Sequence, residues 1–146
     1  MIRKSAVALF SSALLVMGLA TSAMATDAPS SGLGQAWPNA TDVSANPHWH
    51  VYVFQKDGIR YVQVNDLNGG VHGAIATAGG QVLVLPIGRD SQNVTTATST
   101  TTSSSSETVY SDSQVTITAT PLSTGATQLS VAATCTGDPV ECNSHL

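Results

Sequence analysis

The sequence predicts an all-β protein, a small antiparallel sandwich or open barrel of about six strands that follows a cleaved signal peptide. Two observations indicate strands: β-branched and aromatic runs recur along the chain, and turn residues separate them in pairs. A third observation indicates two layers, because the first strand pair is apolar on both faces and has to be covered twice. The length of 146 residues suits one small domain.

Residues 1–25 have the pattern of a secretory signal peptide. Arg3 and Lys4 form a short positive region, residues 6–19 form a nearly uncharged apolar stretch, and residues 23–25 spell an Ala-Met-Ala cleavage site. The apolar stretch is shorter than the roughly 20 residues of a membrane-spanning helix. We therefore expect an exported protein, periplasmic or extracellular, without a membrane anchor.

The charge of the chain after this leader excludes one class of partner. Three basic residues remain against nine acidic ones, a formal net charge of −6. No basic patch is available to displace counterions from a phosphate backbone, so we do not expect nucleic-acid binding. Protein, peptide and glycan partners remain compatible with this composition. The composition does not indicate an oligomeric state.

Residues 26–47 are expected to form an irregular segment, because they contain few large apolar residues and no sustained period. A β-meander of two hairpins is predicted over residues 48–90. The first hairpin pairs residues 49–54 with residues 59–64, since an Asp-Gly dipeptide between two such runs is a strong turn signal. Its loop has two residues, or three with a bulge, which leaves the cross-strand register open by one position.

The second hairpin of the meander pairs residues 71–78 with residues 81–87 around a tight Gly-Gly turn. With a two-residue loop, Ala76 lies opposite Leu83, and small side chains face large ones across the pair. Pro86 lacks an amide donor, so the returning strand is expected to end there or to lie at a sheet edge.

Residues 91–108 are the most unusual stretch, because 13 of these 18 residues are Ser or Thr. Such a stretch buries too little apolar area to offset the entropy of ordering, which predicts a disordered linker or loop. The alternative is an O-glycosylated stalk. Residues 109–146 are expected to contain a C-terminal hairpin, from residues 114–121 and 127–134, that lies over the meander and ends in a tail.

Two cysteines, Cys135 and Cys142, lie in this tail. An even pair in an exported chain predicts a disulfide bond, and the Gly and Pro between them allow the chain to bend. This bond would tie down the tail, since a small ring constrains the unfolded chain less than a long one.

His48 and His50 are the candidate metal ligands. A His-x-His pattern on a strand places two imidazoles on one face about 6.5–7 Å apart, which suits two ligands of one Zn or Cu ion. His72 is the remaining histidine of the domain body, but a simple meander places it two strands away. The competing interpretation is that His48 is an exposed residue at the strand entry and His50 a partly buried one. No other cofactor is expected.

Four aromatic residues, Trp49, Tyr52, Phe54 and Tyr61, lie within 13 positions of a chain that is otherwise poor in aromatics. On an exposed face they would form a binding surface for a peptide, a glycan or a partner strand. The competing interpretation is that they form the core, which a β protein of this size needs.

The sequence contains no catalytic signature. It lacks a G-x-S-x-G elbow, and most of its acidic residues stand in turns, where they serve turn geometry and solubility. We therefore expect a small exported β protein that is not an enzyme and has a binding, structural or cell-envelope role. One alternative is a metal-binding or catalytic periplasmic protein using His48 and His50. Another is an inhibitor or immunity-type protein that binds another secreted protein.

Overall fold

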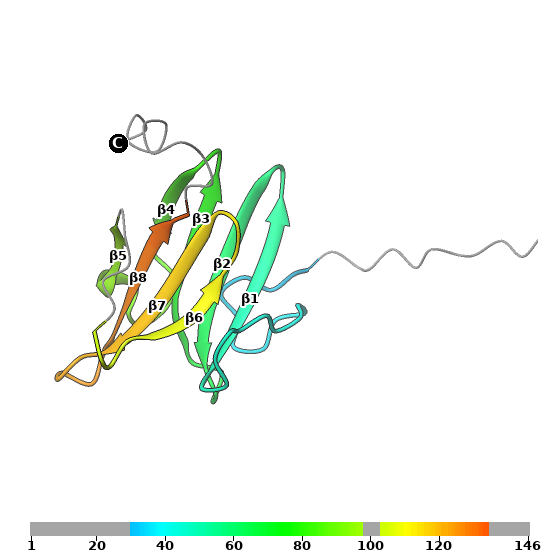
Figure 1. The fold of residues 1–146 in the computed structure, drawn as a ribbon. Helices are drawn as coiled ribbons and strands as arrows, with labels where there is room; N and C mark the ends of the chain where they lie inside the picture. The colour runs from blue at the N-terminus through cyan, green and yellow to red at the C-terminus, as the bar shows by residue number, and fades with distance from the viewer. Residues whose placement is uncertain (1–29, 98–102, 135–146) are drawn as a thin grey trace, which may run out of the picture.

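The computed structural model describes residues 30–97 and 103–134, which form a sandwich of two four-stranded sheets (Figure 1). The prediction of an all-β fold with two layers is confirmed, but the strand number of about six was too low. The predicted signal peptide at residues 1–25, Cys135 and Cys142 lie outside the described residues. Within the described ranges, no helix has the length and apolar character needed to cross a membrane.

The first sheet is the predicted antiparallel meander, in the order β1-β2-β3-β4. The turn of its first hairpin has two residues, Asp57 and Gly58, with φ of 53° and 80°. Positive φ at both positions is what a type I′ turn requires, and it sets the register that the sequence left open. The second hairpin pairs Ala76 with Leu83, as predicted. The strands are β1 (Trp49–Lys56), β2 (Ile59–Asp66), β3 (Val71–Ala78) and β4 (Gln81–Leu85).

The second sheet is mixed, in the order β5-β8-β7-β6, because β5 runs parallel to β8. Its β7 and β8 are the predicted C-terminal hairpin, and Figure 1 shows this sheet lying across the meander. The strands are β5 (Val94–Ala97), β6 (Glu107–Ser111), β7 (Val115–Pro121) and β8 (Thr127–Ala133), and the 3-10 turn η1 (Ser91–Asn93) precedes β5.

The Ser/Thr-rich range 91–108 differs from the expected linker at both of its ends. It contains η1, β5 and the first residues of β6, whereas residues 98–102 lie outside the described part. Val94 packs against the core and anchors β5 beside β8. An edge strand of four residues needs little apolar area, and threonine suits a pleated surface, so the composition argument was wrong for these residues.

The core lies between the two sheets. Side chains alternate along each strand, so Val51 of β1 and Val62 of β2 point inward toward Ile117 of β7 and Leu129 of β8. Each of these four side chains is at most 2% exposed. The inward side of β1 is thus the Trp49, Val51 and Val53 side.

The outer face of the meander is covered by the N-terminal segment, which we define as residues 30–45. Two side chains of β2, Gln63 and Asn65, are fully buried beneath it. Gly34 N–H donates to Gln63 Oε1 at 2.6 Å, and Gln63 Nε2 donates to the Gln35 carbonyl at 2.8 Å. Asn65 Nδ2 donates to the Ala36 carbonyl at 2.8 Å. These amide side chains satisfy the backbone of an irregular segment, which can then lie on an apolar face.

One lateral side of the sandwich is closed by backbone hydrogen bonds from the same segment. Val43 N–H donates to the carbonyl of Val51 in β1, and Ala45 N–H donates to the carbonyl of Val109 in β6, each at 2.8 Å. The segment therefore joins the edge strands of both sheets. On the opposite side, β4 and β5 are the edge strands.

Gly73 tests the packing between the sheets. A Cβ added there would lie 2.8 Å from Leu129 Cδ1 and 3.0 Å from Val94 Cγ2. We expect Gly73→Ala to lower the free energy of unfolding by about 1–3 kcal/mol, because overpacking a close contact forces both neighbours to move. Urea denaturation measures this loss. Ala133→Val, at the exposed end of β8, is the control and should stay within about 0.5 kcal/mol. A Gly73→Ala protein as stable as the native one would contradict the packing.

Candidate functional site

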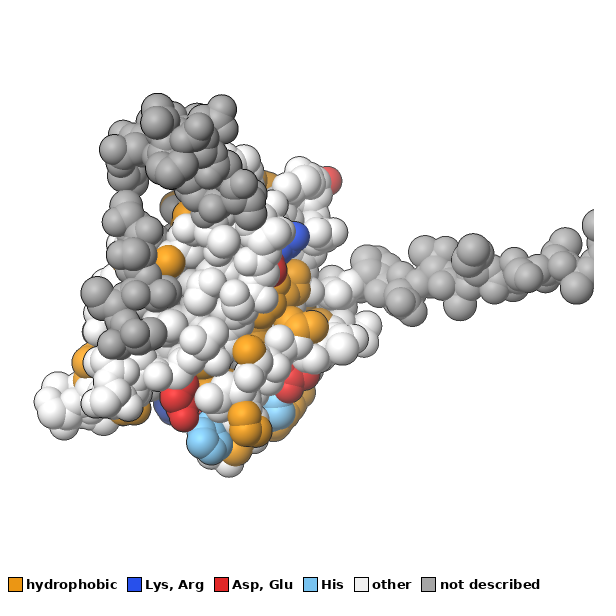
Figure 2. Space-filling model, viewed as in Figure 1, with side chains coloured by type: hydrophobic (Ala, Val, Ile, Leu, Met, Phe, Trp, Pro, Cys, Tyr) orange, Lys and Arg blue, Asp and Glu red, His pale blue; other side chains and the backbone are white. Residues whose placement is uncertain are grey.

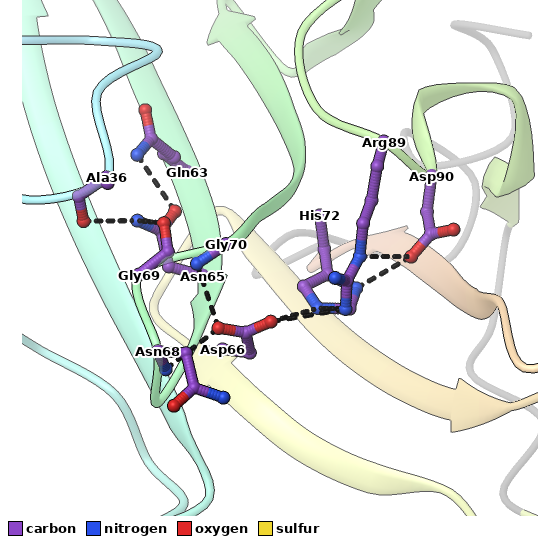
Figure 3. Close-up of polar contacts among 10 residues, drawn as sticks. All are labelled: Ala36, Gln63, Asn65, Asp66, Asn68, Gly69, Gly70, His72, Arg89 and Asp90. Carbon is purple, nitrogen blue, oxygen red and sulfur yellow. Dashed lines mark hydrogen bonds and ion pairs between the residues drawn. The ribbon is translucent and has the colours of Figure 1, made fainter.

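A buried polar network surrounds His72 at the start of β3 (Figure 3). His72 Nδ1 lies 2.6 Å from Asp90 Oδ2, and His72 Nε2 lies 3.2 Å from Asp66 Oδ2. The guanidinium of Arg89 reaches His72 Nε2 at 2.6 Å and Asp66 Oδ2 at 3.1 Å. The side chains of His72 and Asp90 are 3% and 6% exposed. The network thus joins the β2–β3 turn to the loop after β4.

Both ring nitrogens of His72 are engaged within this network. A carboxylate accepts, so His72 Nδ1–H donates to Asp90 Oδ2. Nε2 lies between the guanidinium of Arg89 and the carboxylate of Asp66. Two backbone bonds hold the loop in place, since Arg89 N–H donates to the Val71 carbonyl and Asp90 N–H to the His72 carbonyl. Gly88 makes this approach possible, because a Cβ there would lie 2.5 Å from the His72 backbone.

This geometry makes His72 a structural residue. A histidine paired with a carboxylate can act as a general base only if its other nitrogen reaches a substrate or a nucleophile. Here that nitrogen faces Arg89 and Asp66, and the ring of Trp49 packs edge-on at 5.0 Å. The network therefore ties two loops to the sheet, and its contacts occupy both ring nitrogens of His72.

His48 and His50 are held by two separate carboxylates. His48 Nδ1 lies 2.9 Å from Glu107 Oε1 of β6, and His50 Nδ1 lies 2.6 Å from Asp42 Oδ2 of the N-terminal segment. The His48 side chain is 68% exposed and that of His50 26%. Figure 2 shows histidine side chains next to acidic ones at one end of the molecule. Within the described ranges, no group of three or more His, Cys, Asp and Glu side chains is arranged to hold a metal ion.

The four candidate aromatic residues have different surroundings. Tyr52 and Phe54 are 6% and 5% exposed, which favours the core interpretation for these two. Trp49 is partly buried against the inner core, and its Nε1 donates to Glu107 Oε2 at 2.9 Å. Tyr61 stays partly exposed on the outer face of β2, directly opposite Phe54. Of the proposed aromatic surface, the Tyr61 side thus remains accessible.

A pocket of about 420 Å³ opens beside Tyr61, between the first hairpin and the start of the N-terminal segment. This volume lies within the range of small-ligand pockets, roughly 300–1,000 Å³. Its apolar walls are formed by Phe54, Tyr61 and Leu33. Polar side chains stand at its rim. The complete lining comprises Ser30, Ser31, Gly32, Leu33, Phe54, Gln55, Lys56 and Tyr61.

Lys56 at this rim differs from the other basic residues of the described part. Arg60 forms an ion pair with Asp112, and Arg89 forms one with Asp66. Of the three basic residues in ranges 30–97 and 103–134, Lys56 is the one that forms no ion pair. An exposed ammonium group beside an apolar pocket can therefore receive an anionic group without breaking an existing contact.

Sequence reasoning identified Phe54 and Tyr61 but missed the rest of the pocket and the His72 network. The network residues lie on three segments, and no spacing in the chain marks them as neighbours. Lys56 carried one signal, since it is one of only three basic residues after position 25. No family model, curated protein or solved structure compared with the chain matches it.

The His72 network gives a prediction about stability. Asp90→Ala leaves the buried Nδ1–H of His72 without an acceptor, so we expect the free energy of unfolding to fall by about 1–3 kcal/mol. Asp90→Asn keeps an acceptor oxygen and should lose less. His48→Ala, which breaks an exposed histidine–carboxylate pair, is the matched control and should change stability by less than about 1 kcal/mol. Chemical denaturation measures all three, and an equal effect of Asp90→Ala and His48→Ala would refute the structural role.

The acidic residues predict how stability depends on pH. Hydrogen bonds from Trp49 and His48 lower the pKa of Glu107. Burial opposes ionisation of Asp112, but hydrogen bonds from the backbone of Val115 and Gln114 outweigh it and lower the pKa. A carboxylate whose folded pKa is lowered stabilises the fold above its unfolded pKa and loses that contribution as the pH falls.

We therefore expect the free energy of unfolding to decrease as the pH falls below 4.5 and 3.8, the ordinary pKa values of Glu and Asp, toward the lowered pKa values of the folded state. Denaturation at a series of pH values measures it. Asp112→Asn should flatten the slope in this window, because asparagine does not titrate. A stability that rises between pH 5 and pH 3 would show that these hydrogen bonds are not formed.

Proposed function

We propose that this protein is an exported binding module that uses the outer-face pocket to hold an apolar side chain of an acidic peptide or protein segment. The single observation that carries this proposal is the unpaired Lys56 at the rim of an apolar pocket in an acidic protein. Next to the pocket, the outer face of β2 is covered by the N-terminal segment at Gln63 and Asn65.

Two features of the pocket support this choice of partner. Its walls are mostly aromatic and aliphatic, which suits an apolar anchor such as Phe or Leu. Lys56 and the hydroxyl groups of Ser30 and Ser31 can bind a carboxylate next to that anchor. An inhibitor or immunity-type role would be a special case of this module, with a secreted protein as the partner.

A metal-binding or catalytic role of His48 and His50 has less support. Each imidazole uses Nδ1 to contact a carboxylate from a different segment. The two side chains therefore serve to attach β1 to β6 and to the N-terminal segment. A binding role requires no catalytic group, and both ring nitrogens of His72 are already in contact with Asp90, Asp66 and Arg89.

The proposal is tested by titrating the protein with two short capped peptides while its amide NMR signals are recorded. One peptide carries Phe between two Glu residues, and the other carries Phe between two Lys residues. We expect the acidic peptide to shift the amide signals of Leu33, Gln55 and Lys56. The basic peptide and the Lys56→Gln protein should each show an affinity about fivefold lower, because one partly exposed ion pair contributes roughly 1 kcal/mol.

Leu67→Ala is the control, because Leu67 is an exposed apolar residue, 51% accessible, that does not line the pocket. Its affinity for the acidic peptide should equal that of the native protein. Equal binding of both peptides, or signal shifts confined to residues away from the pocket, would overturn the proposal.

A further inference from the structure

Trp37 of the N-terminal segment is an exposed aromatic residue that does not line the pocket, and 60% of its surface is accessible. A Cβ added to Gly69 would lie 2.8 Å from Trp37 Cε2 and 3.0 Å from both Cζ2 and Nε1. Cε2 is the nearest atom although its two bonded neighbours flank it in the ring plane, so the contact lies on the face of the indole. Trp37 thus rests one face on a buried glycine of the β2–β3 turn, while most of its surface stays accessible.

Two elements hold this indole in a fixed position. Gly69 permits the face contact because it has no side chain and adopts a φ of 82°. His50 of β1 supports the ring from the side, with ring centroids 5.6 Å apart and an angle of 64° between the planes. An exposed tryptophan that is already ordered loses little side-chain entropy when a ligand packs on it, and tryptophan is enriched where binding energy is concentrated. The open side of Trp37 is therefore a preorganised aromatic platform.

His50 connects this platform to a carboxylate. Its Nδ1 lies 2.6 Å from Asp42 Oδ2, and the Asp42 side chain is 36% exposed. Burial opposes ionisation of Asp42, but hydrogen bonds from His50 and from the backbone of Val51 and Ser44 outweigh it and lower the pKa. Asp42 is therefore negatively charged at neutral pH. We call Trp37, His50 and Asp42 together the Trp37 surface.

The charge of the described residues is uneven along the strands. At the β1–β2 turn, two basic residues stand beside two acidic ones: Lys56, Arg60, Asp57 and Asp112. At the other end of β1, one basic residue stands among four acidic ones: Arg89, Asp42, Asp66, Asp90 and Glu107. Figure 2 shows hydrophobic side chains beside acidic and histidine ones at one end of the molecule. The end with the Trp37 surface thus carries the excess negative charge, which attracts cations.

We propose that the Trp37 surface binds an arginine side chain of a basic peptide segment, with the guanidinium stacked on the open side of the indole and beside the Asp42 carboxylate. Tryptophan is the aromatic residue that attracts a cation most strongly over its face. A guanidinium is planar and weakly hydrated and therefore stacks well, whereas a lysine ammonium holds its water more tightly. A neutral ligand gains nothing from the charge at this end, and an anionic ligand is repelled by it.

The Trp37 surface is separate from the pocket, which lies at the Lys56 end of β1. The first described residue, Ser30, lines that pocket. The last one, Thr134, donates its N–H to the carbonyl of Gln114, two residues after Asp112, and so lies toward the same end. The two sites select ligands of opposite charge, and the binding of arginine does not rest on the proposed function of the pocket.

NMR titration with three capped peptides tests this proposal. Each peptide carries two copies of one residue separated by glycine: arginine, lysine or citrulline, the neutral analogue of arginine. We expect the arginine peptide to shift the indole N–H signal of Trp37 and the amide signals of His50 and Gly69. Its affinity should fall with added salt, because salt screens the attraction to exposed carboxylates. The citrulline peptide should bind at least fivefold more weakly, and the lysine peptide should lie between the two.

Two variants separate the indole from the carboxylate. Trp37→Leu keeps an apolar side chain but removes the aromatic face, and should weaken binding of the arginine peptide about fivefold. Asp42→Asn keeps an acceptor oxygen for the backbone but removes the charge, and should reduce both the affinity and its salt dependence. Leu83→Ala, which removes an apolar residue of similar exposure from β4, is the control and should bind as the native protein does. Circular dichroism shows whether each variant keeps the fold.

Equal binding of the arginine and citrulline peptides overturns the proposal, because the surface then takes a neutral ligand. Binding that is unchanged in a folded Trp37→Leu protein also overturns it, because the peptide then contacts another part of the molecule. Absence of any shift at Trp37 has the same consequence. Weaker binding in both variants, with Leu83→Ala unchanged, supports it. None of these outcomes depends on the pocket, whose amide signals at Gln55 and Lys56 report on the acidic peptide.

Discussion

The first hairpin is apolar on both faces, and the rest of the structure depends on the need to cover it twice. Its inner side, with Val51, is covered by the second sheet, and its outer side, with Tyr52 and Phe54, by the N-terminal segment. Burial of these side chains supplies a large share of the apolar area that a domain of this size can remove from water. The second sheet and the irregular segment thus have the same physical role on opposite faces.

The cover on the outer face explains why two amides are buried in an apolar sheet. An irregular segment carries backbone groups that it cannot pair internally, and a purely apolar face such as that of Tyr52 and Phe54 would leave these groups unsatisfied. Gln63 and Asn65 supply the missing donors and acceptors. The segment then continues to β6, so one stretch of chain both covers a face and joins the two sheets.

Local signals predicted the elements that depend on neighbours in the sequence. The Asp-Gly and Gly-Gly turns, the alternation along 114–121 and the pairing of Ala76 with Leu83 all follow from the chemistry of a few adjacent residues. The short β5 was missed because its stability comes from β8, more than 30 residues away, and from a single partly buried valine, Val94. The His72 network was missed because its members converge only after the fold has formed.

The candidate surfaces also consist of a part that local sequence signals predicted and a part that depends on distant residues. The aromatic cluster was visible in the sequence, but which of its members are buried depends on the path of the N-terminal segment over the first hairpin. Tyr61 is partly exposed and lines the pocket together with Leu33 and Phe54. Pro86 predicted that the strand before it ends there or lies at a sheet edge, and both hold, since β4 ends at Leu85 and is the last strand of its sheet.

The central claim is that the first hairpin is covered on both faces, by the second sheet and by the N-terminal segment. Amide hydrogen exchange on the native protein tests this claim most directly. The N–H groups of Gly34, Val43 and Ala45 belong to an irregular segment, but each is hydrogen bonded to the sandwich. If the segment covers the hairpin as described, these amides exchange as slowly as those near the ends of β1 and β2. Exchange at the rate of an unstructured peptide, while β7 and β8 stay protected, would show that the outer face is open and would contradict this account.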